Sequence, residues 1–337
     1  MLKQEVSARY GPMVGGNPKF MAQLDLAKRA APSTVTILIL GETGTGKEVV
    51  ARAIHEWSPR KSKPFVAVNC AAIPKDLLEN ELFGHERGAF TGAVKREAGK
   101  IEMAEGGTVF LDEIGDMSLS LQSHLLRLLQ DQTFYRVGGT QPVKTDVRFL
   151  AATNKDLKQA IHQGTFREDL FYRLEGIAIH LPPLRERMDD VPALARHFVS
   201  RSGKLGVQKQ CAIGDAAMRV LTAYDWPGNI RELENVLTRA LILAPGATIE
   251  PEHLHLSGAS TQAPGPGADD LDDIRHYHDK MEAYSCKVLE EALRRNHWNQ
   301  TRAAEDLGLQ RTYLTKLLRQ KQISGHPPKT DDPAAPH

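Results

Sequence analysis

The amino-acid sequence predicts an α/β protein, in which a parallel β-sheet with crossover helices is followed by a smaller all-α region and by a further small helical unit. Short β-rich runs alternate with helical patterns through the N-terminal half, which is typical of parallel sheets. A glycine-rich loop ending in lysine separates the first of these runs from a helical pattern. After Leu181-Pro182-Pro183 the β-rich runs stop and helical patterns take over.

Five short apolar runs in the N-terminal half are predicted to be buried strands. They are Thr34–Leu40, Phe65–Asn69, Thr108–Leu111, Val147–Ala151 and Ile177–Leu181. Residues 14–182 therefore form the predicted α/β subdomain, after a short lead at residues 1–13.

Residues 183–256 are predicted to form the all-α region, with helices from about Asp189 to Leu243. Its last helix begins at Pro227-Gly228-Asn229. We expect Asn229 to cap this helix, with Glu232, three residues later, closing a capping box.

The C-terminal part divides into a linker, a third unit and a tail. Residues 257–270 are small or helix-breaking and have almost nothing to bury, so they are predicted to be a flexible linker. Residues 271–325 show helical patterns again, and the proline-rich residues 326–337 are expected to be disordered.

Composition limits the classes of protein to which the chain can belong. Among 337 residues, 43 basic and 42 acidic side chains nearly cancel, so the overall charge gives no argument for nucleic-acid binding. The widely spaced Cys70, Cys211 and Cys286 fit a reducing cytosol and supply no thiolate zinc site. The N-terminus lacks the apolar run of a signal peptide, and stretches such as Val35–Leu40 are too short to cross a bilayer. We expect a cytoplasmic protein with no membrane partner.

The glycine-rich loop has the G-x-x-x-x-G-K spacing of a phosphate-binding loop. Its residues are Gly41, Glu42, Thr43, Gly44, Thr45, Gly46 and Lys47. Glycines let successive backbone N–H groups turn toward phosphate oxygens, the helix N-terminus adds partial positive charge, and the lysine reaches the β- and γ-phosphates. The alternative is a plain glycine-rich turn, but strand, glycines, lysine and helix in register favour phosphate binding.

Two carboxylates are predicted to complete the nucleotide site. Position 48 is Glu48, where a Mg²⁺-binding Ser or Thr is usual, so the metal must depend on a second acidic site and water. Asp112 and Glu113 follow a buried strand, at the end where α/β sheets place ligands. We expect Asp112 to hold Mg²⁺ and Glu113 to polarise the attacking water. An apolar run followed by two acidic residues is a weak signal by itself, because many strands end in solvated acids. It becomes specific because the same sequence also contains the phosphate loop.

The stretch from Glu81 to Ala93 contains a motif that composition does not explain. Its six residues are Gly88, Ala89, Phe90, Thr91, Gly92 and Ala93. They match the GAFTGA signature, and the chain resembles the AAA+ activators of sigma-54 RNA polymerase, the bacterial enhancer-binding proteins. The resemblance covers roughly Val14 to Leu256, while the third unit resembles the Fis-type helix-turn-helix of many members. Glu48 agrees with this family, whose loop usually ends in Gly-Lys-Glu.

The resemblance implies an AAA+ P-loop sheet at residues 14–182, a helical lid subdomain at 183–256 and a small all-α helix-turn-helix domain at 271–325. It implies ATP and Mg²⁺ as cofactors. The implied partners are the sigma-54 RNA polymerase holoenzyme, enhancer DNA and further copies of the chain, from a dimer to a hexameric ring. The implied activity is ATP hydrolysis that remodels the closed promoter complex to the open one. A generic AAA+ remodeller and a repressor with a vestigial ATPase are the alternatives, and the intact motifs argue against both.

The GAFTGA segment has small residues around one exposed aromatic residue. This pattern predicts a mobile hairpin tip with a single apolar contact point. The resemblance implies that Phe90 and Thr91 touch sigma-54 when ATP turnover raises the loop. The alternative is a surface loop that packs Phe90 on itself.

The resemblance implies four further kinds of site residue. Asn69 is similar to the switch residue that hydrogen-bonds Glu113 until the γ-phosphate is sensed, although a strand-end asparagine is more often only a turn former. Asn154 resembles sensor I, and Arg231 resembles the sensor II arginine of the lid. Within Phe166–Leu174, Arg167 and Arg173 resemble arginine fingers that reach the nucleotide of a neighbouring subunit. Their alternative is surface pairing with nearby acids, worth little.

The third unit has the sequence pattern of a helix-turn-helix. Asn299–Leu309 is a short helix ending in Leu-Gly-Leu, Gly308 supplies the turn, and a second helix is predicted from Gln310 to Arg319. Seven basic against two acidic residues give positions 294–321 a local charge of +5. The candidate DNA contacts are Arg302, Arg311, Thr312, Tyr313, Thr315, Lys316 and Arg319. The alternative is an ordinary amphipathic helical hairpin.

Two features bear on assembly and control. Apolar residues recur at 3-4-3-4 spacing ahead of the helix-turn-helix, and this seam either pairs with a second copy or packs on its own domain. They are Ile274, Tyr277, Met281, Tyr284 and Val288. About a dozen residues precede Val14, so we expect control by a partner protein or a longer natural chain.

Overall fold

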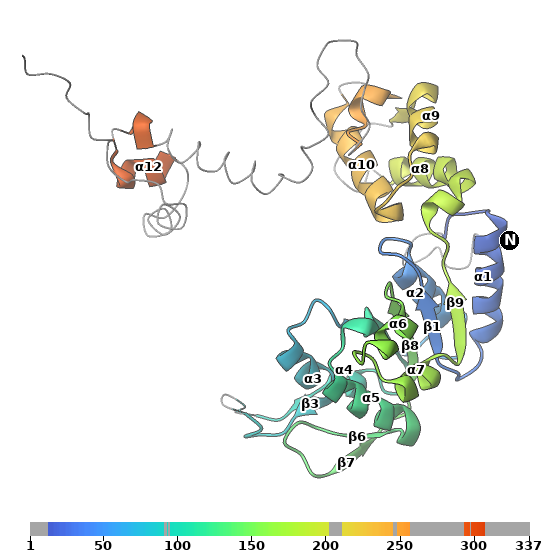
Figure 1. Ribbon diagram of the computed structural model, residues 1–337, viewed down its shortest axis with the longest axis vertical. Helices are drawn as coiled ribbons and strands as arrows, with labels where there is room; N and C mark the ends of the chain where they lie inside the picture. Colours follow the sequence, from blue (N-terminus) through green and yellow to red (C-terminus); the bar gives the residue numbers. More distant parts are fainter. Residues whose placement is uncertain are drawn as a thin grey trace, which may run out of the picture. The chain divides into compact units, whose positions relative to one another are not determined.

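The computed structural model describes residues 13–90, 93, 95–201, 211–244, 248–256, 293–296 and 298–306 (Figure 1). The chain divides into two compact units, Met1–Ala259 and Ser260–His337. Each unit is described by itself.

A five-stranded parallel sheet forms the centre of the larger unit. Its order is β2-β5-β8-β1-β9, and every neighbouring pair is parallel. The strands are β1 (Ile37–Leu40), β2 (Phe65–Asn69), β5 (Thr108–Asp112), β8 (Arg148–Thr153) and β9 (Ile177–His180). The predicted parallel α/β fold is confirmed, and the largest difference in strand bounds is at the first strand. The first strand begins at Ile37 rather than Thr34, and the side chain of Val35 is 42% exposed, so its apolar character does not reflect burial.

Helices cover both faces of the sheet, which is why its strands are continuously apolar. Ile37 and Ile39 of β1 pack in the core with α1 (Pro18–Ala30) and α2 (Lys47–Glu56). Leu38, between them, points to the opposite core. That core includes α3 (Lys75–Phe83), α4 (Lys100–Met103), α5 (Leu119–Asp131), α6 (Leu157–His162) and α7 (Glu168–Leu174).

Two short antiparallel strand pairs extend from the sheet-and-helix body. One joins β3 (Gly84–His85) to β4 (Glu97–Ala98), and the other joins β6 (Thr133–Tyr135) to β7 (Pro142–Lys144). Figure 1 shows both beside α3 and α5, at the end of the α/β subdomain away from α8 to α10.

The lid follows two short 3₁₀ helices, η2 (Leu184–Glu186) and η3 (Met188–Asp190). Its helices are α8 (Val191–Ser200), α9 (Asp215–Ala223) and α10 (Asn229–Leu243). Their apolar faces pack around the fully buried Trp226. The region is not purely helical, because β10 (Ala212–Ile213) pairs in parallel with β11 (Thr248–Ile249) before the 3₁₀ helix Pro251–His253.

The predicted capping role of Asn229 is wrong. Gly228 is the N-cap of α10, and the Glu232 carboxylate accepts its backbone N–H at 2.7 Å. Asn229 is the first residue of the helix, has φ 56°, and directs its carboxamide to other segments. Glu232, four residues after the N-cap, therefore satisfies the N-cap N–H without forming the predicted capping box.

The described part of the smaller unit centres on α12 (Gln300–Asp306). The Asn299 carboxamide oxygen accepts the N–H groups of Thr301 and Arg302, and Ala303 and Ala304 are buried. This helix matches the first helix predicted for the helix-turn-helix. The turn at Gly308, the second helix with its candidate DNA contacts from Arg311 to Arg319, the linker, the apolar seam and the tail lie outside the described residues.

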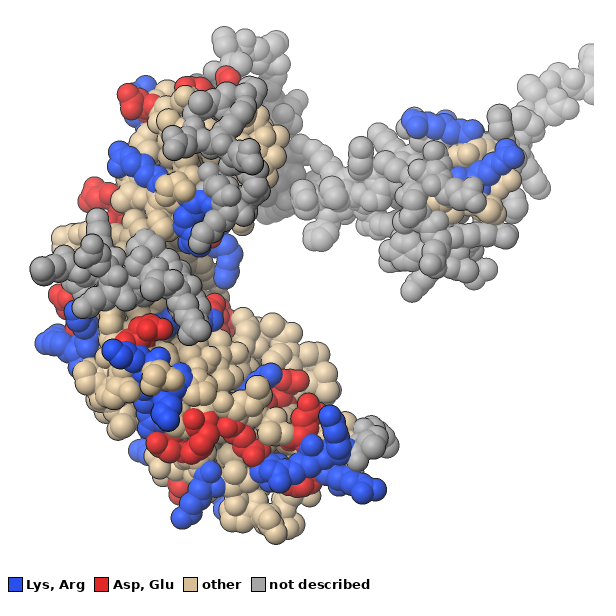
Figure 2. Space-filling model, turned by 180° about the vertical axis from the view of Figure 1, so that it is seen from behind, with Lys and Arg blue, Asp and Glu red and all other residues tan. Residues whose placement is uncertain are grey.

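Within the part of the chain that the structure describes, no helix is both long enough and apolar enough to cross a membrane. Figure 2 shows Lys and Arg side chains interspersed with Asp and Glu side chains over one face of the larger unit.

Candidate nucleotide-binding site

The glycine-rich loop connects β1 to α2 at the carboxyl edge of the sheet. Gly44 and Gly46 have φ values of 82° and 98°, which favour glycine. Lys47 is buried, and its Nζ donates to the carbonyl oxygens of Gly41 at 2.9 Å and Glu42 at 3.3 Å. The predicted strand–loop–helix arrangement is therefore present.

The acidic pair lies beside this lysine. Glu113 Oε1 is 3.7 Å from Lys47 Nζ, and the Glu113 N–H donates to Asp112 Oδ1 at 3.0 Å. Burial, followed by the charge of Glu113, raises the pKa of Asp112 above its ordinary value. A cation beside Asp112 would offset both effects, since an opposite charge favours the carboxylate.

The residues present fit a nucleotide-bound Mg²⁺. Among the described residues, no group of three or more His, Cys, Asp and Glu side chains could hold a metal ion on protein ligands alone. Mg²⁺ is commonly held by one or two carboxylates together with substrate phosphates and water. Asp112, half-buried beside the phosphate loop, suits that arrangement.

Asn154 connects the loop to the acidic pair. Its Nδ2 donates to Thr43 Oγ1 at 2.9 Å, and its backbone N–H donates to Glu113 Oε2 at 3.3 Å. The preceding Thr153 ends β8 and is fully buried, so the strand fixes where Asn154 begins. The residue proposed as sensor I therefore lies at the site.

Asn69 lies near the site but has a different partner from the one predicted. It is in register with Asp112 across β2 and β5. Its carboxamide oxygen accepts the N–H groups of Ala71 and Ala72, both at 3.0 Å. Among the described residues no hydrogen bond joins Asn69 to Glu113, whose carboxylate contacts Lys47 and Asn154 instead. In this structure Asn69 is the turn former.

A pocket of about 380 Å³ opens over the loop, between the sheet edge and the lid. Predicted site residues line it: the loop from Thr43 to Glu48, both carboxylates of the acidic pair, and Arg231 of α10. Such a volume suits a small-molecule ligand.

Sequence reasoning missed the apolar part of this pocket. Its residues are Met13, Val14, Phe20, Val49, Val50, Leu194, Phe198 and Ile230. Leu194 and Phe198 are four residues apart on α8, and His197 of the same helix and its C-cap residue, Arg201, also line the pocket. The i, i+4 spacing of these two apolar residues on one lid helix is the sequence feature that could have indicated this apolar wall.

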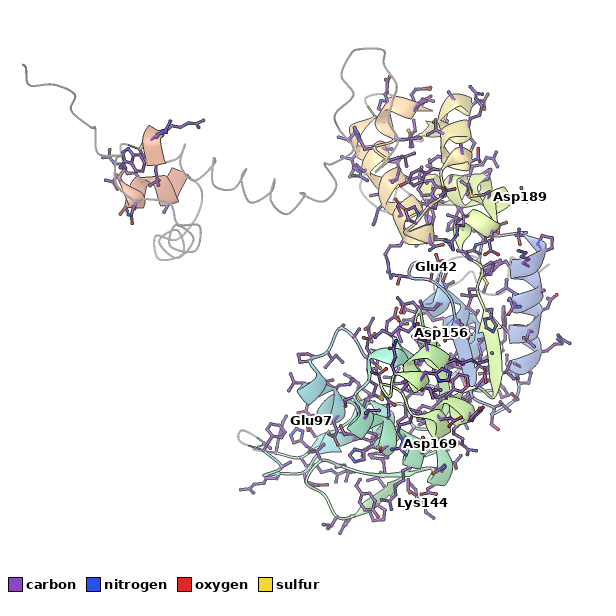
Figure 3. The ribbon with its side chains drawn as sticks, viewed as in Figure 1. Glu42, Glu97, Lys144, Asp156, Asp169 and Asp189 are labelled. Carbon is purple, nitrogen blue, oxygen red and sulfur yellow. The ribbon has the colours of Figure 1, made fainter. Side chains whose placement is uncertain are left out.

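Glu42 was predicted to contact nucleotide, but its side chain faces the lid. Its carboxylate pairs with Arg185 at 2.5 and 2.8 Å and accepts Asn229 Nδ2 at 3.1 Å. These hydrogen bonds, first that of Arg185, lower the pKa of Glu42 to about 2. Figure 3 shows Glu42 where the α/β subdomain meets the lid. Phosphate binding by the loop depends on its glycines and its lysine. The side chain of Glu42, the second residue of the loop, instead connects the loop to the lid.

Glu48 lines the pocket at the first turn of α2 and is 51% exposed. Its Oε1 accepts Arg52 Nε at 3.0 Å and Nη2 at 2.6 Å, along the same helix face.

The two candidate finger arginines lie on or next to α7. Arg167 pairs with Asp169 at 2.7 Å and reaches Ser123 Oγ at 3.2 Å. Arg173 donates to the Leu129 carbonyl at 2.8 and 3.2 Å. Both side chains are exposed, and neither is among the residues that line the pocket of their own chain. In Figure 3, Asp169, the partner of Arg167, lies well away from Glu42.

The GAFTGA segment follows β3 and remains partly exposed. Gly88 has φ 85° and donates its N–H to the Ala93 carbonyl at 2.9 Å, while the Ala93 N–H donates to the Phe90 carbonyl at 3.0 Å. Phe90 is 43% exposed and packs edge-on against the His85 ring, with centroids 4.9 Å apart. Thr91 and Gly92 lie outside the described residues.

The second hairpin, β6–β7, braces the base of this segment. Arg136 donates to Glu86 at 2.9 Å and to both carboxylate oxygens of Glu102 at 2.7 and 2.9 Å. A Cβ at Gly138 would meet the Ala89 Cβ at 2.8 Å, so the two loops touch. Sequence analysis did not identify this contact.

Comparisons with known proteins agree with this geometry. Residues 13–180 match the sigma-54 interaction domain family, residues 185–269 the AAA+ ATPase lid domain, and residues 280–320 the bacterial regulatory protein Fis family. The chain is 46% identical over 313 residues to the Nif-specific regulatory protein of Azotobacter vinelandii, covering 91% of this chain and 59% of that protein. It is 44% identical over 344 residues to the DNA-binding transcriptional regulator NtrC of a Bradyrhizobium species, covering 93% and 70%.

Solved structures give the same result. NtrX from Brucella abortus in complex with ATP has 37% sequence identity and a TM-score of 0.69, covering 92% of this chain and 70% of that one. The same protein in complex with ADP has 36% identity and a TM-score of 0.70. With its P-loop sheet, lid and Fis-type helix-turn-helix segment, the chain belongs to the family of sigma-54-dependent AAA+ transcriptional activators.

Proposed function

We propose that this chain hydrolyses ATP and uses the turnover to remodel the sigma-54 RNA polymerase closed promoter complex into the open one. The observation that carries the proposal is the convergence of Lys47, Glu113 and Asn154 at one sheet edge, under a lid that brings Arg231 to the same pocket. Brucella NtrX, which shares the fold, was solved with ATP and with ADP.

The site divides binding from chemistry. The backbone N–H groups of residues 41–47 and the Lys47 ammonium bind phosphate oxygens, since the loop precedes a helix N-terminus. Glu113 Oε orients a water for attack on the γ-phosphorus and accepts its proton. Asp112 would hold Mg²⁺, which neutralises developing phosphate charge when bound. Asn154 keeps the Glu113 carboxylate aligned with the loop.

The proposal includes a ring of identical subunits. Arg167 and Arg173 lie outside the pocket of their own chain, as residues acting on a neighbour's nucleotide must. They would stabilise the charge that develops on the transferred phosphoryl group. Copies of the chain would assemble through a dimer into a hexameric ring.

Client and DNA contacts belong to other segments. Phe90 and Thr91 would touch sigma-54 from the loop between β3 and β4. The unit at 271–325 would bind enhancer DNA through the basic residues of its helix-turn-helix, Arg302 among them. This activity takes place in the cytoplasm, where polymerase and chromosome are found.

Open-complex formation by purified components tests the proposal. Sigma-54 holoenzyme on a sigma-54 promoter is mixed with the chain and either ATP or a non-hydrolysable analogue. We expect heparin-resistant complexes with ATP alone. ATP hydrolysis without open complexes, or open complexes with the analogue, would contradict the proposed coupling.

A further inference from the structure

We propose that Asn229 is a positioning residue that fastens the phosphate loop to the lid, so that the position of the loop sets where Arg231 points. The inference rests on the proposed ATP hydrolysis. It concerns the outer side of the loop, which does not face nucleotide.

A loop that turns its N–H groups toward phosphate turns carbonyl oxygens outward, and buried carbonyls need hydrogen-bond donors. Here three consecutive carbonyls receive donors from the segment that carries the lid. Thr43 O accepts Asn229 Nδ2 at 3.1 Å, and Gly44 O accepts the Ile230 N–H at 3.0 Å. Thr45 O accepts Nη2 of the buried Arg187 at 3.1 Å. The outer side of the loop is thus completed by the lid.

The Asn229 side chain makes hydrogen bonds to both the phosphate loop and the segment that leads into the lid. It is fully buried, and its Nδ2 donates to both Glu42 Oε2 and Thr43 O at 3.1 Å. Its Oδ1 accepts the Leu184 N–H at 2.7 Å. One carboxamide therefore joins the phosphate loop, the segment after β9 and the first turn of α10.

The residue type follows from these bonds. Both donors and the acceptor are used, so an aspartate of the same shape would keep only the bond to Leu184. It would also place a second negative charge against the Glu42 carboxylate. The backbone φ of 56° is one that asparagine tolerates better than most residues.

Arg231 lies two residues beyond Asn229 and lines the pocket. A Cβ on Gly44 would be 2.4 Å from the Gly228 carbonyl oxygen and 3.2 Å from Arg231 Cβ. The loop therefore packs directly on the turn that carries Arg231, and loss of the Asn229 bonds frees that turn to move.

We expect Asn229→Asp to lower ATP turnover at least about tenfold, which corresponds to about 1.4 kcal/mol in the barrier. Nucleotide affinity should change much less, because the inward N–H groups and Lys47 remain. Asn235→Asp, an exposed position on the same helix, makes the same chemical change and should leave turnover unaltered.

A double-mutant cycle with Arg231→Ala tests whether Asn229 acts through that arginine. ATP turnover, nucleotide affinity and the melting temperature are measured for both single variants and for the double variant. If the inference holds, the double variant is no slower than the slower single variant. Losses that multiply independently would overturn it, as would a normal turnover number in a folded Asn229→Asp protein.

Asn229→Gly supports the same cycle if the aspartate variant fails to fold, because glycine accepts the left-handed backbone and removes the side chain. Parent protein that binds ATP without hydrolysing it would refute the proposed function. An active parent with a purely multiplicative cycle would refute this inference alone.

Discussion

At the scale of residues, the groups that we propose to bind phosphate lie close to the group that we propose to act on water. Lys47 Nζ and Glu113 Oε1 are 3.7 Å apart. Lys47 also bonds to two loop carbonyls, so it helps to hold the loop itself. Among the hydrogen bonds described above, none joins the Glu113 carboxylate to the backbone of the loop.

We expect Lys47→Ala to abolish nucleotide binding and Glu113→Gln to retain binding while stopping hydrolysis. Removing the ammonium takes away a phosphate contact and unfastens the loop. Removing the Glu113 charge takes away only the group that activates water. Equilibrium binding of a fluorescent ATP analogue, measured beside phosphate release, separates the two. Equal loss of binding in both variants would show that Glu113 is misassigned.

Glu42 predicts a pH dependence of stability. Its pKa is lowered to about 2 from an ordinary value of 4.5, mainly by the hydrogen bond from Arg185. The Glu42–Arg185 pair therefore stabilises the fold fully above about pH 4.5 and loses its contribution as the pH falls toward 2. Both side chains are more than 40% exposed, so water screens the pair and we expect the effect to be small.

The free energy of unfolding of the parent and of Glu42→Gln, followed from pH 6 downward, checks this prediction. The difference in free energy of unfolding between the parent and Glu42→Gln should become smaller below about pH 4.5. Parallel curves for the two proteins throughout that range would be the contrary result.

At the scale of elements, the strands and helices that could be predicted are those whose sequence pattern is local. Buried parallel strands are apolar throughout, so all five were found, and only the exposed Val35 misled the first boundary. Strands of two or three residues, such as β3 and β6, are too short to give a pattern. The side-chain partners of Glu42 and Asn229 could not be predicted, because Arg185 and Thr43 are 143 and 186 residues away in the sequence. Nothing in a local stretch of sequence indicates such contacts.

The contact between the β6–β7 turn and the GAFTGA segment leads to a prediction. Gly138 has φ 73°, and an added Cβ would meet Ala89 at 2.8 Å. Gly138→Ala should therefore displace the loop, keep most ATP hydrolysis and impair open-complex formation.

Gly164→Ala is the matched control. Gly164 has φ 67°, and no atom lies within 4 Å of an added Cβ, so this variant carries the same backbone strain without the contact. Both variants should lose about 1 kcal/mol of stability, since left-handed backbone disfavours alanine. Equal activation by the two alanine variants would mean that the contact with Ala89 is unimportant.

At the scale of the whole molecule, the nucleotide pocket is built from parts far apart in the chain. The lead before α1, the sheet edge, α8 and α10 each contribute a wall. Neither candidate finger arginine, Arg167 or Arg173, is among the residues that line it. We therefore propose that full turnover needs these arginines from a second copy of the chain.

A mixed-ring experiment tests that requirement. A subunit with Arg173→Ala and an intact phosphate loop should regain ATP turnover when mixed with a Lys47→Ala subunit, which still offers its own arginines. Removing a positioned arginine costs about 10³–10⁵-fold in related phosphoryl transfers, whereas a surface pair is worth at most about 1 kcal/mol. Rings of confirmed mixed composition that show no rescue at any ratio would count against trans action.

The most direct test of the central claim measures ATP hydrolysis and sigma-54 open-complex formation on one preparation of Thr91→Ala. Thr91 belongs to the GAFTGA segment, whose neighbouring Phe90 is 43% exposed and is not among the residues that line the nucleotide pocket. If turnover drives this loop against sigma-54, the variant keeps most of its ATPase activity and loses open-complex formation. Normal open-complex formation by Thr91→Ala, or parallel loss of both activities in a folded protein, would contradict the account.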